Sequence, residues 1–237
     1  EAAGARSDTA LGEPLPESGR GTLSVTRVEK KQRRRNPQPP FITSTLQQEA
    51  SRKLRFTAQQ TMRVAQQLYE GVDTGNGTVG LITYMRTDSV NLSQEAIQGL
   101  REVITDRFGS DKLPASPHHY RTRAKNAQEA HEGIRPTDAA RHPESLRGSL
   151  NDDQYRLYDL IWKRTVACQM IHATIDTVSV DLAAARTAVF RASGSTIRDP
   201  GFMAVYSEGQ DDGAGETGEK ILPALAEGDR IPLLAPR

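Results

Sequence analysis

The sequence has little of several features that would restrict its class. It contains one cysteine, Cys168, so no disulfide can form within the chain, and this composition fits a reducing compartment. No apolar run approaches the roughly 20 residues that cross a bilayer, so we expect no membrane segment. The 31 basic and 30 acidic residues leave a formal charge of +1, so any positive field that attracts nucleic acid must be local.

Motifs for nucleotide hydrolysis and metal binding are also missing. The sequence has no Gly-x-x-x-x-Gly-Lys loop for nucleoside triphosphates and no Cys-x-x-Cys pair for zinc. Its acidic pairs, Asp152-Asp153 and Asp211-Asp212, are adjacent, whereas an Asp-x-Asp-x-Asp cluster alternates. We therefore predict no metal site within this chain.

The two ends of the sequence favour a piece of a longer protein. It starts at Glu1 without Met and lacks the basic and apolar regions of a signal peptide. It stops at residues 230–237, which are strand-like and lead to no closing element. Residues 1–21 are rich in Gly, Ala, Ser, Glu and Pro and can bury little surface, so we predict a flexible segment.

Four helices are expected from capping residues and apolar repeats. Their N-terminal signals are Ser44, Thr57 and Ser93 for the first three, and Asn151 or Asp152 for the fourth. Gly71 and Gly109 follow the second and third apolar stripes, where glycine commonly ends a helix.

The pattern elsewhere alternates with the period of a β-strand. It predicts strands at 23–27, 177–182 and 188–192, and a strand-like run at 202–206 after a Pro-Gly turn. The order of strand, helices and strands indicates an α+β fold. In it, a helical domain at 42–170 is inserted between two segments of a β-stranded domain, 22–41 and 171–237.

Tyr84 is the strongest candidate for chemistry. An apolar run at 79–82 leads to it, so we expect it at a strand end, and Arg86 follows two residues later. A phenol with a pKa near about 10 attacks poorly at neutral pH unless a base or a positive charge assists it. A guanidinium can hold phosphate oxygens, and Asp88 could orient it. Alone, however, Tyr-x-Arg is more often a strand-edge tyrosine beside a surface arginine.

Three longer motifs carry a resemblance to a known family. They read Pro40-Phe-Ile-Thr-Ser-Thr-Leu-Gln-Gln-Glu, Leu81-Ile-Thr-Tyr-Met-Arg-Thr-Asp-Ser and Ala130-His-Glu-Gly-Ile-Arg-Pro-Thr-Asp. In order and spacing they resemble three signatures of type IA DNA topoisomerases, and the resemblance covers residues 38–206. Met85 is typical of the bacterial topoisomerase I branch.

The resemblance implies roles for individual residues. Tyr84 would attack a phosphodiester of single-stranded DNA to form a 5′-phosphotyrosine, and Arg86 would contact the scissile phosphate. His131 would contact phosphate nearby, although a lone histidine is more often a structural hydrogen-bond partner. Arg135 is a plausible contact to the DNA backbone and could equally be a buried ion-pair partner. Gly133 stands where the family usually has Ala.

Two basic stretches are further candidates for DNA contacts. Arg121, Arg123 and Lys125 lie just before the histidine motif and are the better candidates. The run at 30–35 could contact DNA electrostatically, but could also be a solvated strand exit that discourages edge pairing. We favour the second interpretation for that run.

The resemblance also explains why motifs for metal binding are missing from this sequence. Family members hold Mg²⁺ in an N-terminal Toprim domain and often carry zinc ribbons in the tail. The resemblance implies a central arch fragment of a cytoplasmic, nucleoid-associated enzyme. That enzyme would cut one DNA strand, pass another through the break and religate without ATP, and so relax negative supercoils. Its partners would be single-stranded DNA and the missing domains of the same polypeptide. We expect the fragment alone to be inactive.

Three other functions were weighed against this one. A module that binds single-stranded DNA without chemistry of its own remains compatible with the sequence. A tyrosine recombinase or type IB topoisomerase is disfavoured, because those enzymes use a tyrosine near the C-terminus and Tyr84 lies in the first half. A purely structural α+β domain is disfavoured by three motifs in family order.

Overall fold

The structure is a computed structural model that describes residues 22–75, 77–120, 131–184, 188–207 and 221–232. The chain divides into two compact units. Of the described residues, the β-stranded unit takes 22–34, 174–199 and 221–232, and the helical unit takes 35–173 and 200–207. The predicted α+β class, with helices inserted between two β-stranded segments, is confirmed. The predicted flexible segment at 1–21 lies outside the described residues.

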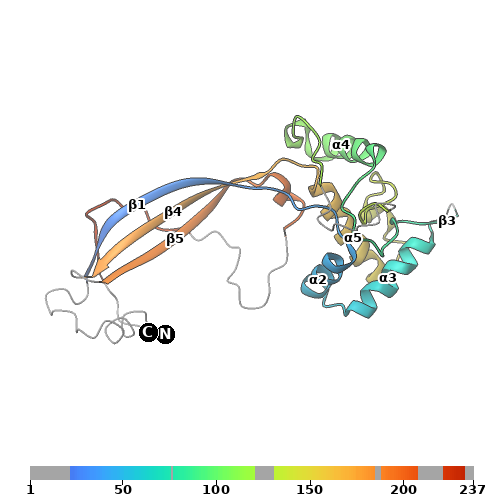
Figure 1. The fold of residues 1–237 in the computed structure, drawn as a ribbon, viewed down its shortest axis with the longest axis horizontal. Helices are drawn as coiled ribbons and strands as arrows, with labels where there is room; N and C mark the ends of the chain where they lie inside the picture. The colour runs from blue at the N-terminus through green and yellow to red at the C-terminus, as the bar shows by residue number, and fades with distance from the viewer. Residues whose placement is uncertain (1–21, 76, 121–130, 185–187, 208–220, 233–237) are drawn as a thin grey trace. The chain divides into compact units, whose positions relative to one another are not determined.

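The β-stranded unit is a curled antiparallel sheet. Its described strands are β1 (Thr22–Arg35), β4 (Ala173–Ala184), β5 (Ala188–Asp199) and β6 (Arg230–Pro232), in the order β5-β4-β1-β6. Figure 1 shows β1, β4 and β5 as long curved ribbons that run side by side. Few of their side chains are buried, so backbone pairing rather than a core holds the described sheet together.

The basic run at 30–35 is the second half of β1, not an exit from it. Within it, the Gln32 amide donates to Asp176 on β4 (3.0 Å), and the Thr177 hydroxyl donates to the Lys31 carbonyl (3.0 Å). Pairing with β4 therefore extends the strand beyond the alternating residues that predicted it.

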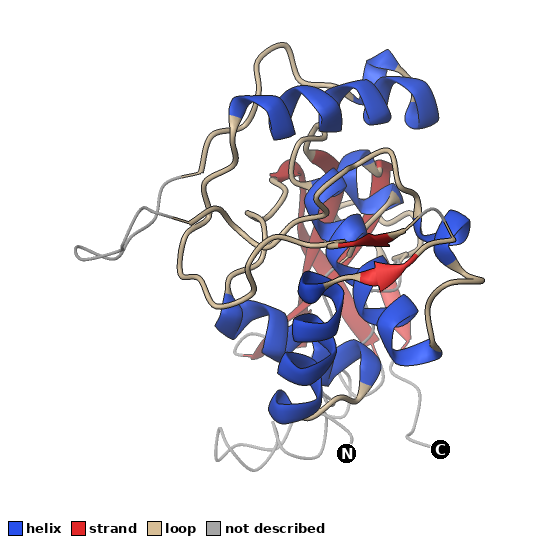
Figure 2. Cartoon of the chain, turned by 90° about the vertical axis from the view of Figure 1, so that its right-hand side faces the viewer, coloured by secondary structure: helices blue, strands red, loops and turns tan. Residues whose placement is uncertain are grey.

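The four predicted helices are all present in the helical unit. They are α2 (Thr43–Leu54), α3 (Ala58–Glu70), α4 (Gln94–Phe108) and α5 (Asp152–Ala167). α5 packs against the other three, and its Leu157, Tyr158, Ile161 and Trp162 are almost wholly buried. A short antiparallel hairpin follows α3 and lies at the front of Figure 2. Its strands, β2 (Val72–Asp73) and β3 (Thr78–Val79), have two residues each.

Three of the four predicted caps are correct. The side chains of Thr57, Ser93 and Asn151 accept hydrogen bonds from backbone N–H groups three residues on. The first helix instead has Ile42 at its N-cap, and the Thr45 hydroxyl accepts from the Ile42 N–H (3.0 Å). The prediction of Ser44 was wrong because the preceding Thr43 is fixed by contacts from a distant part of the chain, described below.

The predicted strand at 202–206 was also wrong. Gly201–Ala204 form a 3₁₀ turn, and Phe202 and Tyr206 are buried in the helical unit. The Tyr206 hydroxyl donates to Glu49 on α2 (2.7 Å), and Arg164 on α5 donates to that hydroxyl (3.3 Å). These contacts place residues 200–207 with the helical unit, whereas we expected the β-stranded domain to start at 171.

Candidate active site

The segment that carries Tyr84 is irregular rather than a strand end. β3 stops at Val79, and only an isolated bridge pairs Ile82 with Pro136. The Leu81 N–H donates to the Leu68 carbonyl at the end of α3 (2.7 Å). The segment is therefore positioned by tertiary hydrogen bonds on both sides, which periodicity cannot reveal.

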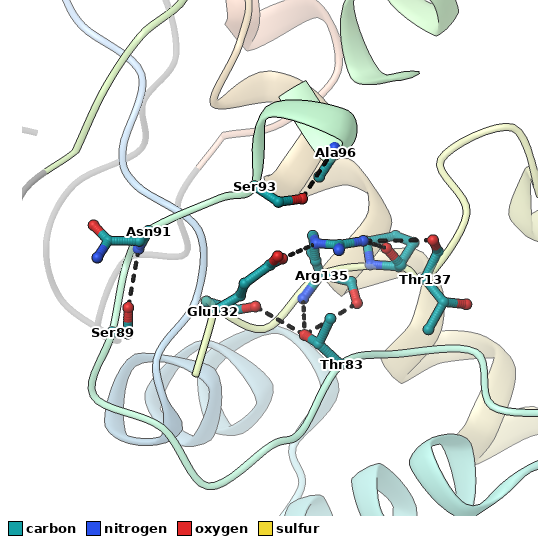
Figure 3. Close-up of polar contacts among 10 residues, drawn as sticks. Thr83, Ser89, Asn91, Ser93, Ala96, Glu132, Arg135 and Thr137 are labelled. Carbon is teal, nitrogen blue, oxygen red and sulfur yellow. Dashed lines mark hydrogen bonds and ion pairs between the residues drawn. The ribbon is translucent and has the colours of Figure 1, made fainter. Parts of the chain in front are cut away.

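Thr83 joins the tyrosine motif to the histidine motif. Its hydroxyl donates to the Gly133 carbonyl (2.8 Å) and accepts from the Arg135 N–H (3.0 Å), and its own N–H donates to the Arg135 carbonyl (2.9 Å). Figure 3 shows the Thr83 hydroxyl facing this stretch of backbone. The residue immediately before Tyr84 is thus held in place by both its backbone and its side chain.

Thr43 makes the matching contacts on the other side of Tyr84. Its hydroxyl donates to the Met85 carbonyl (2.8 Å) and accepts from the Thr87 N–H (3.0 Å), while its N–H donates to the Thr87 carbonyl (3.0 Å). Met85 itself is wholly buried. All three sequence motifs therefore meet around Tyr84. Thr83 fixes the backbone before it, and Thr43 fixes the backbone after it.

The Tyr84 ring is half-buried between two other rings. Its centroid lies 5.4 Å from that of Tyr69 in an edge-to-face arrangement and 5.2 Å from that of His131. Within the described residues, the Tyr84 hydroxyl makes no hydrogen bond. Ring packing rather than a hydrogen bond from the hydroxyl therefore orients Tyr84 among the described residues.

A cavity of about 430 Å³ adjoins this site. It is lined by Ile42, Thr43, Ser44, Gln47, Arg86, Thr87, Asp88 and His131. Arg86 and His131 are exposed, and the cavity includes the first residues of α2, which carries no acidic residue in its first turn. The N-terminus of a helix has a partial positive charge that favours anions. Together with the guanidinium, it makes this cavity suitable for a phosphate group.

Asp88 lines the same cavity, but the predicted pairing with Arg86 is not seen. In the part of the chain that the structure describes, Arg86 forms no ion pair. The role of Asp88 in orienting that guanidinium therefore stays a prediction.

Arg135 is placed differently from Arg86 and His131. Its Nε donates to the Glu132 carboxylate, its Nη1 donates to the Pro136 carbonyl (2.9 Å), and its side chain is only 16% exposed (Figure 3). It lines a second cavity, of about 360 Å³, with the first turn of α4. Of the two alternatives for Arg135, the structure shows the ion pair, and a DNA contact stays a prediction.

Arg121, Arg123 and Lys125 lie outside the described residues, so their predicted DNA contacts stay predictions. The described residues contain no group of three or more His, Cys, Asp or Glu that could hold a metal ion. None of the described helices is long and apolar enough to cross a membrane.

Sequence reasoning missed three residues that shape the site: Thr43, Thr83 and Tyr69. Both threonines stand inside motifs that were recognised, but a hydroxyl that bridges distant backbone gives no local signal. Tyr69 follows the apolar stripe of α3, and nothing in the sequence there distinguishes it from an ordinary surface tyrosine.

The chain as a whole is similar to known DNA topoisomerases. The solved structure of full-length topoisomerase I from Thermotoga maritima matches with a TM-score of 0.75 and 32% identity, over 93% of this chain and 35% of that one. DNA topoisomerase 1 of Xylella fastidiosa is 52% identical over 222 residues, which is 92% of this chain and 27% of that protein. DNA topoisomerase 1 of Rickettsia felis is 54% identical over 204 residues, which is 86% of this chain and 26% of that protein.

The family model described as DNA topoisomerase matches residues 10–235. The chain therefore belongs to the DNA topoisomerase family, as the resemblance predicted. It spans only about a quarter of the length of these two curated relatives.

Proposed function

We propose that this chain supplies the nucleophilic tyrosine of a type IA DNA topoisomerase. The observation that carries the proposal is the setting of Tyr84: a hydroxyl without a hydrogen-bond partner among the described residues, beside His131, on a segment whose Arg86 lines a cavity suited to phosphate. We propose a phosphodiester of single-stranded DNA as the group attacked, as the family resemblance implies.

The reaction is a transesterification. The Tyr84 phenolic oxygen bonds to phosphorus, the bond from phosphorus to the 3′-oxygen breaks, and the 5′ end stays on the protein as a phosphotyrosine. The phenolic proton passes to a base, and the leaving 3′-oxygen takes up a proton. Because one phosphodiester replaces another, the reverse reaction can reseal the strand without ATP.

Arg86 and His131 would stabilise the transition state. Negative charge builds on the non-bridging oxygens as the phenol attacks, and preorganised donors at that position typically contribute about 10²–10³ in rate. The exposed Arg86 guanidinium can bind two such oxygens at once. The exposed His131 imidazole, whose ring packs against Tyr84, is close enough to contact the same phosphate.

The described residues contain no group of three or more His, Cys, Asp or Glu, and hence no cluster of three carboxylates for Mg²⁺. We propose that the metal and the general base lie in a Toprim domain of a longer polypeptide. The isolated chain would then be inactive. The whole enzyme would pass a second strand through the break, relax negative supercoils and work in the cytoplasm on the nucleoid.

Covalent trapping tests this function. The full-length enzyme that contains this chain is mixed with Mg²⁺ and a single-stranded oligonucleotide labelled at its 3′ end, then stopped with detergent. We expect label to be linked to the protein, to disappear in Tyr84→Phe and to persist in the matched variant Tyr155→Phe. Labelled protein from Tyr84→Phe would contradict the proposal.

The same assay separates the second candidate, a binding module without chemistry. The lack of a metal cluster in the described residues favours that role for the chain when it is alone. A binding module would bind the oligonucleotide without covalent label, both as the isolated chain and in the full-length protein. Label on the full-length protein alone supports the topoisomerase.

A further inference from the structure

Tyr69 is an exposed aromatic residue with no evident structural purpose. It belongs to the last turn of α3, and 41% of it is exposed, which makes it one of the few large hydrophobic residues on the described surface. Its ring nevertheless meets the Tyr84 ring edge-to-face, with centroids 5.4 Å apart and planes at 64°. This is a preferred geometry for an aromatic pair.

The backbone fixes the distance between the two rings. The Leu81 N–H donates to the Leu68 carbonyl (2.7 Å), and a Cβ at Gly80 would lie 2.7 Å from the Tyr69 carbonyl oxygen. Only glycine permits so close an approach of the tyrosine segment to α3. The end of α3 and the Tyr84 segment are therefore in direct backbone contact.

The Tyr84 ring depends on its aromatic neighbours for orientation. Its hydroxyl makes no hydrogen bond within the described residues, so no polar contact there sets the tilt of the ring. His131 is exposed and lies outside any helix or strand, whereas Tyr69 is part of a regular helix. Of the two rings, Tyr69 is the better-anchored support.

We propose that Tyr69 is a positioning residue, whose ring edge holds Tyr84 in the orientation from which its oxygen attacks phosphorus. This inference rests on the proposed function. Reacting atoms must be about 3–3.5 Å apart and aligned, so a small tilt of the phenol slows the chemical step. Binding of the oligonucleotide does not depend on this tilt.

Single-turnover trapping in the full-length enzyme tests the role. At saturating 3′-labelled single-stranded oligonucleotide, we expect Tyr69→Leu to lower the rate of covalent attachment about five- to tenfold, which is the size of an aromatic-pair contact. Tyr69→Phe keeps the ring and should stay within about twofold of wild type. Binding, measured by fluorescence anisotropy in the Tyr84→Phe background, should change less than about twofold in each variant.

Matched variants guard against general effects. Tyr155→Leu makes the same change on α5 and should leave the rate unaltered. Because Tyr69 is exposed, Tyr69→Leu should lose no more stability than that of the ring contact, about 0.5–1.5 kcal/mol. Tyr69→Gln provides a second ring-free variant that suits the end of a helix, should the leucine protein not fold.

Three results would overturn the inference. The first is a wild-type rate in both ring-free variants. The second is weaker binding with an unchanged saturated rate, which would mean that Tyr69 stacks on a base. The third is an equal loss in Tyr69→Phe, which would mean that the hydroxyl acts. Label on Tyr84→Phe would instead show that the proposed function itself fails.

Discussion

The candidate residues for chemistry were easier to identify from the sequence than the residues that hold them in place. Tyr84, Arg86 and His131 were identified from motifs, and the structure brings all three together. Arg135, in the same motif as His131, instead forms an ion pair with Glu132. A motif shows which residue types occur together, but not which side of the backbone each faces. That depends on hydrogen bonds between segments far apart in sequence.

Thr83 provides a prediction at this scale. Thr83→Val keeps the shape of the side chain but leaves the Gly133 carbonyl and the Arg135 N–H without their partner. An unsatisfied buried polar group costs about 1–3 kcal/mol, so we expect the free energy of unfolding to fall by about that amount. Urea denaturation measures it.

Two companions complete the Thr83 experiment. Thr83→Ser retains the hydroxyl and should recover most of the loss. Thr105→Val removes an exposed hydroxyl that bonds only within α4 and should change stability by less than about 0.5 kcal/mol. Equal stability of Thr83→Val and wild type would mean that the hydroxyl does not hold the two motifs together.

Elements with strong local signals were predicted well. Caps at Thr57, Ser93 and Asn151 place three helix starts, because a side-chain oxygen and a nearby N–H suffice to specify them. Gly71 and Gly109 end their helices with φ of 127° and 97°. The run at 202–206 was misread because burial of Phe202 and Tyr206 in the core of the helical unit outweighs its strand-like composition.

Gly80 provides a prediction about how elements are joined. In Gly80→Ala, the new Cβ would lie 2.7 Å from a backbone oxygen of α3, so the backbone must shift. We expect a loss of about 2 kcal/mol or more, since strain and a broken backbone contact both contribute.

The matched change for Gly80 is Gly99→Ala, inside α4, where an added Cβ meets nothing within 4 Å. Alanine is the better helix former by about 0.8–1.0 kcal/mol, so this variant should be more stable than wild type. Opposite signs for the two glycines in chemical denaturation are expected. The same sign would refute the close approach.

At the scale of the whole molecule, the two units differ in how they are stabilised. The helical unit has a core around α5, whereas the described sheet buries few side chains and carries surface ion pairs such as Asp181–Arg191. The Arg191 guanidinium lowers the pKa of Asp181, but exposed pairs contribute little to stability. Every tyrosine of the sequence falls within the range of the helical unit, and so does Trp162.

This asymmetry predicts a selective response to alkaline pH. Burial raises the pKa of Tyr158 and of Tyr206, and burial raises the pKa of Cys168 to about 12. Above the pKa of an unfolded tyrosine, near about 10, unfolding releases a proton that the folded state retains. The raised pKa values therefore stabilise the fold below that pH, and the stability is lost as pH rises above it.

Each such group contributes a slope of up to about 1.4 kcal/mol per pH unit. Urea denaturation followed by Trp162 fluorescence at pH 8, 9.5, 10.5 and 11 should therefore show a falling midpoint in the helical unit. Tyr158→Phe should make the decline shallower, because phenylalanine has no proton to release. Thr105→Val, which removes an exposed hydroxyl that does not titrate in this range, should leave it nearly unchanged. A midpoint that stays level to pH 11 would mean that these tyrosines ionise freely in the folded protein.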